Sequence, residues 1–224
     1  MAKSVSHQAI PAKGKRRLSG RRARRAAETR DAIVGAALRL FARQGFVATT
    51  VEQITQAADV GKGTFFNYFP TKEHLLTGFA ELQLARIRKA LELARKGGVP
   101  IQQVVWQLVV SLTEIPGQSP DLVRSFLLVL VSRGRVGPLM RRKLMQGRTW
   151  LGELVVVGQQ RGEVRRDLEA GAVARHLQQV FLGGLLLWTL HPATTLARWV
   201  RPTFELFWRS VGAPKRRGKR KPGA

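Results

Sequence analysis

The chain has 224 residues, and 44% of them are apolar, so it is long enough to bury a core and has the composition of a globular protein. It contains no cysteine, which excludes disulfides, thiolate metal sites and a cysteine nucleophile. Lys and Arg number 39 against 14 Asp and Glu, and this formal charge of +25 favours a polyanionic partner such as nucleic acid or an anionic membrane surface.

Much of the positive charge lies at the two ends of the chain. Residues 1–30 hold ten basic residues and one acid, and residues 212–224 hold six basic residues and no acid. Residues 1–27 have almost no large apolar side chains, so we expect a flexible basic arm there. Residues 212–224 are likewise expected to form a basic, disordered tail.

No segment is predicted to enter a membrane. The longest apolar stretch, Phe181 to Leu190, has ten residues, whereas a spanning helix needs about 20. The basic N-terminus is not followed by the apolar stretch of a secretory signal. We therefore expect a cytoplasmic protein.

Helices are predicted first between residues 28 and 97. Apolar residues at helical spacing predict a helix from about residue 28 that ends at Gly45. Thr50, with Gln53 three residues later, has the capping-box pattern of a short second helix. A turn at residues 59–61 leads to a third helix, which Pro70 ends, and a long fourth helix runs from about residue 71 to Gly97.

The remaining sequence also predicts helices, and it has no alternating strand pattern. Pro202 lies inside the last of them, so we expect a kink or a later start there. The predicted helices run over residues 100–114, 119–133, 138–160, 167–190 and 195–211. The predicted fold class is therefore all-α.

The span Ala48 to Leu76 reads ATTVEQITQAADVGKGTFFNYFPTKEHLL, a capped helix, a tight turn and a second short helix. This arrangement is typical of a helix-turn-helix reader of DNA. It closely resembles the TetR family of bacterial transcription regulators over residues 28 to about 78. The residues in register are Thr49, Thr50, Val51, Ile54, Ala57, Val60, Gly63, Thr64, Phe69, Lys72, Glu73 and Leu76.

Three positions depart from the family pattern. Asp59 stands where the family usually has a turn glycine, and Gly61 where it usually has serine. Both residues are compatible with the turn, because Asp tolerates a left-handed conformation and Gly can cap a helix. Phe66 replaces the usual tyrosine and so lacks a hydroxyl that could contact phosphate.

The third helix carries the predicted DNA-reading face. Helical spacing turns Val60, Phe65 and Phe69 inward and leaves polar side chains on the outer surface. The resemblance implies that Thr50 and Lys72 bind phosphate, while Gly63 allows close approach to the DNA backbone. The alternative is that the aromatic residues fill the core and Lys72 is a solvated charge. The predicted DNA-binding residues are Thr50, Lys62, Gly63, Thr64, Phe66, Asn67, Tyr68 and Lys72.

Residues 31–74 contain four basic and four acidic side chains, so the reader has no net charge. Electrostatic attraction to DNA is then expected from the arm, which is rich in arginine. The arm could grip phosphates non-specifically or enter a neighbouring minor groove, and both alternatives stay open.

The resemblance implies that residues 75–211 form a helical bundle that dimerises and can hold a small molecule, behind a DNA-binding domain at residues 28–74. The segment from Leu177 to Leu190 is apolar nearly all round, and the last helix has an apolar stripe, so these two helices are expected to form a homodimer in which Gly183 and Gly184 allow close approach. The alternative for bulky central residues is that they fill the core. The candidate pocket residues are Phe79, Trp106, Phe126, Met140, Met145 and Trp150.

The sequence has no catalytic or metal-binding pattern: its four histidines lack ligand spacing, and no nucleophile elbow or phosphate loop is present. We therefore expect no enzyme, no metal and no cofactor. The predicted function is a dimeric regulator that binds double-stranded, palindromic DNA as a repressor and is released by a small apolar effector. Two alternatives are an architectural protein that condenses nucleic acid through its tails and a peripheral membrane protein held by the same tails.

Overall fold

The structure, a computed structural model, describes residues 13–214, with side chains from Arg22 onward. This part of the chain is helical apart from turns and one isolated antiparallel bridge between Val164 and Gly212. None of its helices is both long and apolar enough to cross a bilayer. The elements are α1 (Lys13–Gln44), α2 (Val51–Ala57), α3 (Lys62–Tyr68), the 3₁₀ turn η1 (Lys72–His74), α4 (Leu75–Lys96), α5 (Ile101–Thr113), the 3₁₀ turn η2 (Pro116–Gln118), α6 (Pro120–Val131), α7 (Val136–Gln160), α8 (Ala170–Leu190) and α9 (Leu196–Val211).

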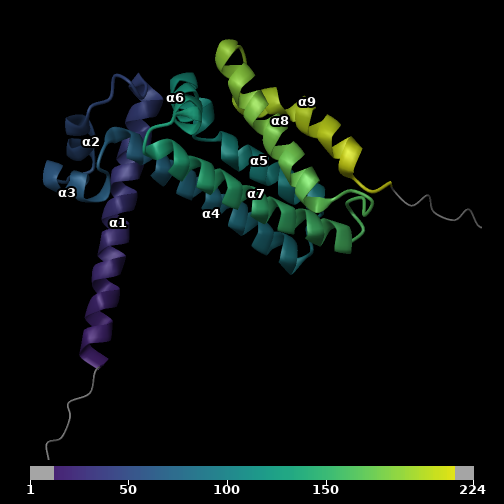
Figure 1. Cartoon of the computed structure of the whole chain (residues 1–224), viewed down its shortest axis with the longest axis horizontal. Helices are drawn as coiled ribbons and strands as arrows, with labels where there is room; N and C mark the ends of the chain where they lie inside the picture. Colours follow the sequence, from purple (N-terminus) through teal and green to yellow (C-terminus); the bar gives the residue numbers. More distant parts are fainter. Residues whose placement is uncertain (1–12, 215–224) are drawn as a thin grey trace, which may run out of the picture.

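The helices form a small unit at one end of the molecule and a larger bundle beside it (Figure 1). Helices α2 and α3 lie beside the C-terminal half of α1, whose N-terminal half projects away from the rest. Helix α4 leads from this unit into the bundle, where it packs along α7, and α7 in turn packs along α8. Helix α9 covers α8 and contacts α5. The arrangement confirms the predicted all-α class with a helix-turn-helix ahead of a bundle.

Local sequence signals explain the turns around α2 and α3. The Thr50 hydroxyl accepts the Gln53 N–H at 3.2 Å, and the Thr50 N–H donates to the Gln53 side chain at 3.0 Å, so the predicted capping box is present. Asp59 has φ 51°, the one non-glycine residue with positive φ in the described range. It therefore adopts the left-handed turn that the family usually gives to glycine.

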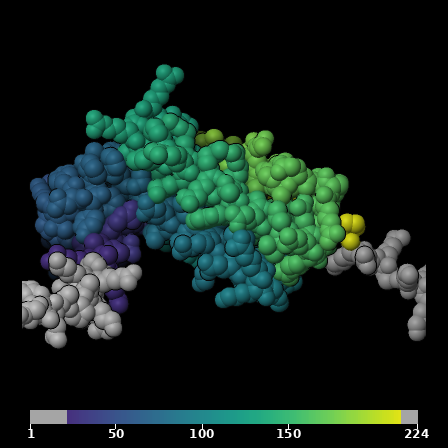
Figure 2. Space-filling model, turned by 60° about the horizontal axis from the view of Figure 1, so that its bottom comes forward, coloured from purple at the N-terminus to yellow at the C-terminus, as the bar shows by residue number. Residues whose placement is uncertain are grey.

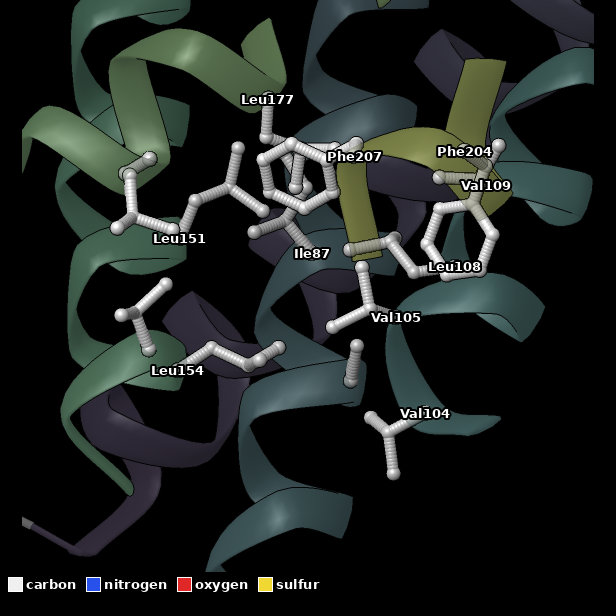
Figure 3. Packing of buried hydrophobic residues seen from close by; sticks show 14 of the residues in the cluster. Ile87, Val104, Val105, Leu108, Val109, Leu151, Leu154, Leu177, Phe204 and Phe207 are labelled. Atoms are coloured by element: carbon white, nitrogen blue, oxygen red, sulfur yellow. The ribbon is translucent and has the colours of Figure 1, made fainter. Parts of the chain in front are cut away.

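Two groups of buried apolar side chains hold the fold together. One, here called the reader core, joins α1–α3 to the start of α4 and to parts of α6 and α7, and it includes the fully buried Phe41, Ile54 and Phe65. The other, the body core, lies among α4, α5, α7, α8 and α9, and Figure 3 shows its side chains directed toward one another between these helices. Burial of this kind contributes about 25 cal/mol per Å² of apolar surface.

Helix α1 begins earlier than predicted. It starts at Lys13, so the expectation of a flexible arm over residues 1–27 is wrong for residues 13–27. Arg, Lys, Ala and Leu have high helix propensity, and extending a helix that is already anchored by packing avoids the unfavourable nucleation step. Residues 1–12 of the arm, and residues 215–224 of the predicted C-terminal tail, lie outside the described part.

Two other predicted helix starts can be compared with the structure. Helix α8 begins at Ala170 rather than Asp167, because the Glu169 carboxylate caps its first N–H groups while Asp167 pairs with Arg165 at 2.6 Å. Helix α9 begins directly after Thr195, whose hydroxyl accepts the Arg198 N–H, and it continues through Pro202. The alternative of a later start at Pro202 is therefore wrong.

Candidate nucleic-acid interface and effector cavity

Helix α3 has one buried face and one exposed face, as its spacing predicted. Phe65 and Phe69 are 0% and 1% exposed and pack in the reader core, with Val60 half-buried beside them. The predicted contact residues divide between full and partial exposure. Lys62, Gly63, Phe66 and Asn67 are exposed, whereas Thr64 and Tyr68 are half-buried.

Two apolar features of this exposed face are not explained by packing within the chain. A Cβ atom added at Gly63 would meet nothing within 4 Å, so no neighbour in the described chain requires a glycine there. Phe66 is 49% exposed and contacts Phe65 edge-on, with ring centroids 5.3 Å apart. Both observations fit a surface that another molecule approaches closely.

Lys62 is held beside α2 by an ion pair. Its Nζ lies 2.6 Å from Glu52 Oε1, and both side chains are well exposed. Hydrogen bonding to Lys62 lowers the pKa of Glu52 below its ordinary value, so this carboxylate is ionised at neutral pH. An exposed pair of this kind contributes little to stability, and Lys62 can exchange Glu52 for a phosphate at low cost.

Lys72, which the family resemblance assigns to phosphate binding, is hydrogen-bonded within the reader. Its ammonium donates to the carbonyls of Phe46, Val47 and Thr49 at 2.8, 3.1 and 2.9 Å, and it lies 4.6 Å from the Phe46 ring centroid. An ammonium has three N–H donors, so all of them are used. Lys72 thus ties the loop between α1 and α2 to the start of α4, and contact with phosphate would require one of these bonds to break.

Thr50 keeps an exposed position at the N-terminus of α2, where backbone N–H groups are directed outward. It is held there from α1, since the Gln44 amide donates to the same Gln53 oxygen at 2.8 Å. Exposed arginines also lie on α1, at positions 39 and 43 in its C-terminal half and at positions 22, 24 and 25 in the half that projects away, where Arg24 pairs with Glu28 at 2.8 Å.

A second candidate site lies inside the bundle. It is a partly open cavity of about 120 Å³ among α4, α5, α6, α7 and α8, with an almost wholly apolar wall. Phe79 and Phe126, both predicted, line it and contact each other edge-on, with centroids 5.9 Å apart. Ile87, Leu108 and Leu151, seen in Figure 3 pointing toward one another, also line this cavity.

The other four predicted pocket residues do not line the cavity. Trp106 packs on Phe204 at 5.1 Å, on the outer side of α5. Met140 is fully buried in the reader core, Met145 is 47% exposed, and Trp150 packs half-buried on the body core. Composition identified bulky apolar residues but could not tell which face of each helix they occupy.

Two residues of the cavity wall were not predicted from the sequence. Leu122 lines it and, like Phe79, also belongs to the reader core. Gln83 follows Phe79 by four residues, on the same face of α4, and brings an amide into the apolar wall. A polar residue within an otherwise apolar stripe was the sequence signal that could have identified Gln83.

Helices α8 and α9 carry exposed leucine side chains. Leu186, Leu187, Leu190 and Leu206 are between 50% and 69% exposed. A Cβ atom at Gly183 would meet nothing within 4 Å, whereas one at Gly184 would lie 3.5 Å from Val200 of α9. Gly183 therefore faces outward and Gly184 faces the neighbouring helix of the same chain.

Residues 33–77 match the family model for bacterial regulatory proteins of the tetR family. The helix-turn-helix part of the chain is therefore of the TetR family. The chain is accordingly a DNA-binding transcription regulator, with α3 in the position of the recognition helix.

Proteins similar to this chain include transcription regulators and a solved structure. The regulator TcmR of Streptomyces glaucescens is 42% identical over 84 residues, which is 37% of each chain. The transcriptional repressor KstR of Rhodococcus jostii RHA1 is 27% identical over 187 residues, covering 80% of this chain and 82% of its own. FadR of Thermus thermophilus, a TetR-family repressor solved with lauroyl-CoA, is 26% identical with a TM-score of 0.61, covering 87% of this chain and all of its own.

Proposed function

We propose that this TetR-family regulator is a dimeric repressor that binds a palindromic operator and is released from it by a small, largely apolar effector. The proposal rests on Phe79 and Leu122, because each of these side chains takes part in two regions of the molecule. Both side chains line the cavity in the bundle and pack in the reader core. A molecule that displaces either one must also act on the helices that hold α3.

The reader supplies the DNA-binding half of this function. In the proposed division, residues 28–74 form the DNA-binding domain and residues 75–211 the effector-binding and dimerisation domain. Asn67 and Tyr68 would contact base edges in the major groove, and Thr50 and Lys62 would contact phosphates. Dimers of such readers contact half-sites about 34 Å apart, one turn of the duplex, which accounts for a palindromic operator.

The dimer is proposed to form through α8 and α9. A contiguous apolar surface that is left exposed on a monomer indicates an interaction site. The exposed leucines of α8 and the outward-facing Gly183 support pairing with the same surface of a second copy, which is the self-complementary geometry of a two-fold dimer.

Contacts between the bundle and the reader support a mechanism in which effector binding in the bundle moves the reader. Asp121, next to Leu122 at the start of α6, is the nearest neighbour of the Gly45 position at the end of α1. Helix α6 and η2 both contact α1, and Figure 2 shows the reader residues continuous with this part of the bundle at one end of the molecule. A shift of α6 would therefore move the point where α1 ends and α2 begins.

The relatives support a repressor that responds to a ligand. KstR is named as a repressor, and Thermus FadR is a repressor that was solved with lauroyl-CoA. A regulator of this kind acts on chromosomal DNA, so we propose that it works in the cytoplasm.

The test begins with an operator obtained by sequencing the genomic fragments that the purified protein retains. Binding to this operator and to random DNA is measured at fixed salt, with and without a library of neutral apolar compounds. We expect the operator to bind about 10³-fold or more tighter than random DNA, and one or more compounds to weaken operator binding. Reciprocal linkage requires the operator to weaken binding of that compound by the same factor.

A pair of neighbouring variants localises the effect to the cavity. Leu144 lines the cavity, whereas the adjacent Met145 is exposed. Leu144→Trp should fill the cavity and abolish release while retaining operator binding, and Met145→Trp should respond as the wild type does. Equal binding to operator and random DNA would contradict the proposal and favour the architectural alternative, in which the basic ends determine affinity.

A further inference from the structure

Gln83, one of the residues that line the cavity, has a buried hydrogen-bond acceptor with no partner. The Gln83 Nε2 group donates to the Leu112 carbonyl at 2.9 Å, and a carbonyl can only accept, so this bond fixes which end of the amide is nitrogen. The Gln83 Oε1 atom is buried and lacks a hydrogen-bond partner, the one such side-chain nitrogen or oxygen in the described residues. A buried acceptor without a partner is unfavourable, so a group that donates to it would be bound preferentially.

The rest of the wall has no group that could balance a negative charge. The other polar residue lining the cavity is Gln178, whose Nε2 donates to the Leu144 carbonyl at 2.9 Å. Both amides therefore use an N–H group on the backbone, and no Lys, Arg or His is among the described lining residues. A carboxylate or phosphate placed here would lose its hydration without gaining a cation, and it would face an acceptor oxygen.

The size of the cavity limits the ligand further. Its volume of about 120 Å³ is close to the roughly 150 Å³ of an apolar protein cavity that holds benzene. Three phenylalanines, Phe79, Phe126 and Phe181, contribute to its wall, and aromatic faces and edges pack well against a planar ring.

We propose that the cavity binds a neutral molecule of about one ring, apolar except for one hydroxyl or N–H group that donates to Gln83 Oε1. This inference rests on the proposed function, because it names the class of effector for the same cavity. It also separates this chain from Thermus FadR, which was solved with an acyl-CoA thioester. The phosphates of a coenzyme A have no matching charge in the cavity described here.

Three probes of similar shape test the proposal on the full-length protein without DNA: 4-ethylphenol, 4-ethyltoluene and 4-ethylbenzoate. At pH 7 the phenol is neutral, since phenols have a pKa of about 10, and the benzoate is ionised. Calorimetry should show that 4-ethylphenol binds about tenfold or more tighter than 4-ethyltoluene, although the hydrocarbon is the more hydrophobic of the two. The benzoate should bind most weakly.

Gln83→Leu removes the acceptor and should reverse the order, so that 4-ethyltoluene binds more tightly than 4-ethylphenol, because the buried hydroxyl then lacks a partner. Gln107→Leu, at an exposed glutamine of α5, is the matched control and should retain the wild-type preference. The comparison of the three probes on the wild type remains decisive if the Gln83 variant is poorly folded.

The inference and the proposed function fail in different ways. If 4-ethyltoluene or 4-ethylbenzoate binds the wild type as tightly as 4-ethylphenol, or if the phenol does not bind at millimolar concentration, the inference is wrong while release by another apolar compound can still hold. If the phenol binds with the expected preference and a saturating concentration leaves operator affinity unchanged, the inference holds and release by occupancy of this cavity is wrong.

Discussion

The reader and the cavity use helices in opposite ways. Helix α3 buries one face through Phe65, and through Phe69 directly after its end, and leaves the other face exposed, although that face includes Phe66. In the bundle, several helices direct apolar side chains toward a shared interior and leave a small space there. The reader can thus contact a large external partner with polar groups, whereas the cavity can hold only a small internal one.

The two regions also differ in how their polar groups are satisfied. Lys72, Thr50 and Gln53 of the reader all have hydrogen-bond partners that fix the loop and the start of α2. The cavity instead retains an acceptor on Gln83 that has no partner. This contrast indicates that the reader is preorganised before it binds DNA, whereas the Gln83 acceptor of the cavity would gain its hydrogen-bond partner from a bound ligand.

The largest expected effect concerns the exposed face of α3. Replacing Asn67 and Tyr68 together by alanine should leave the bundle folded and weaken operator binding, because each lost base contact is worth about 1 to 3 kcal/mol. Binding to random DNA should change much less. Fluorescence anisotropy with both DNAs measures the ratio, and unchanged operator affinity would show that α3 does not read the bases.

Lys72→Met tests whether the stability of the reader depends on the hydrogen bonds that Lys72 donates to the loop between α1 and α2. Hydrogen bonds from a charged donor contribute about 1.5 to 3 kcal/mol, so loss of three bonds should lower the melting temperature of the protein without DNA. A residue that acts only by binding phosphate would instead leave thermal stability unchanged and reduce the salt dependence of DNA binding by about 0.9 in the logarithmic slope. Lys62→Met is the control, because its exposed pair with Glu52 should affect stability little.

Gly183→Trp tests the surface of α8 that is not used for either reading or effector binding. Because Gly183 faces open space, the new ring should not disturb the monomer but should separate two copies, at a cost of about 1 to 3 kcal/mol. Sedimentation should then show a shift from dimer toward monomer. A wild-type protein that sediments as a monomer at micromolar concentration would contradict the proposed dimer at once.

The smallest effect at fixed salt is expected from α1. Replacing Arg22, Arg24 and Arg25 by glutamine should weaken operator and random DNA by similar factors and flatten the logarithmic salt dependence by at most about 0.9 for each lost phosphate contact. Their ratio should barely change. Loss of discrimination with an unchanged salt slope would mean that this part of the chain reads bases, as an arm in the minor groove would.

Local structure near the reader could be predicted well because its signals are short-range. The capping box at Thr50, the left-handed turn at Asp59 and the inward positions of Phe65 and Phe69 depend on residues a few positions apart. The start of α1 could not be predicted in this way, because a segment without large apolar residues is also typical of a disordered arm. A helix rich in Lys, Arg and Ala can extend from an anchored segment without packing.

Sequence alone therefore determined the all-α class, the helix-turn-helix and the family resemblance, since helical periodicity and caps are encoded within single segments. The tertiary structure decided which residues meet. It showed that Lys72 contacts a loop some 25 positions earlier, that Phe79 and Phe126 line the cavity while Met145 does not, and that Gln83 Oε1 is left without a partner. Those facts depend on how separate helices are rotated and packed against one another, which no local pattern specifies.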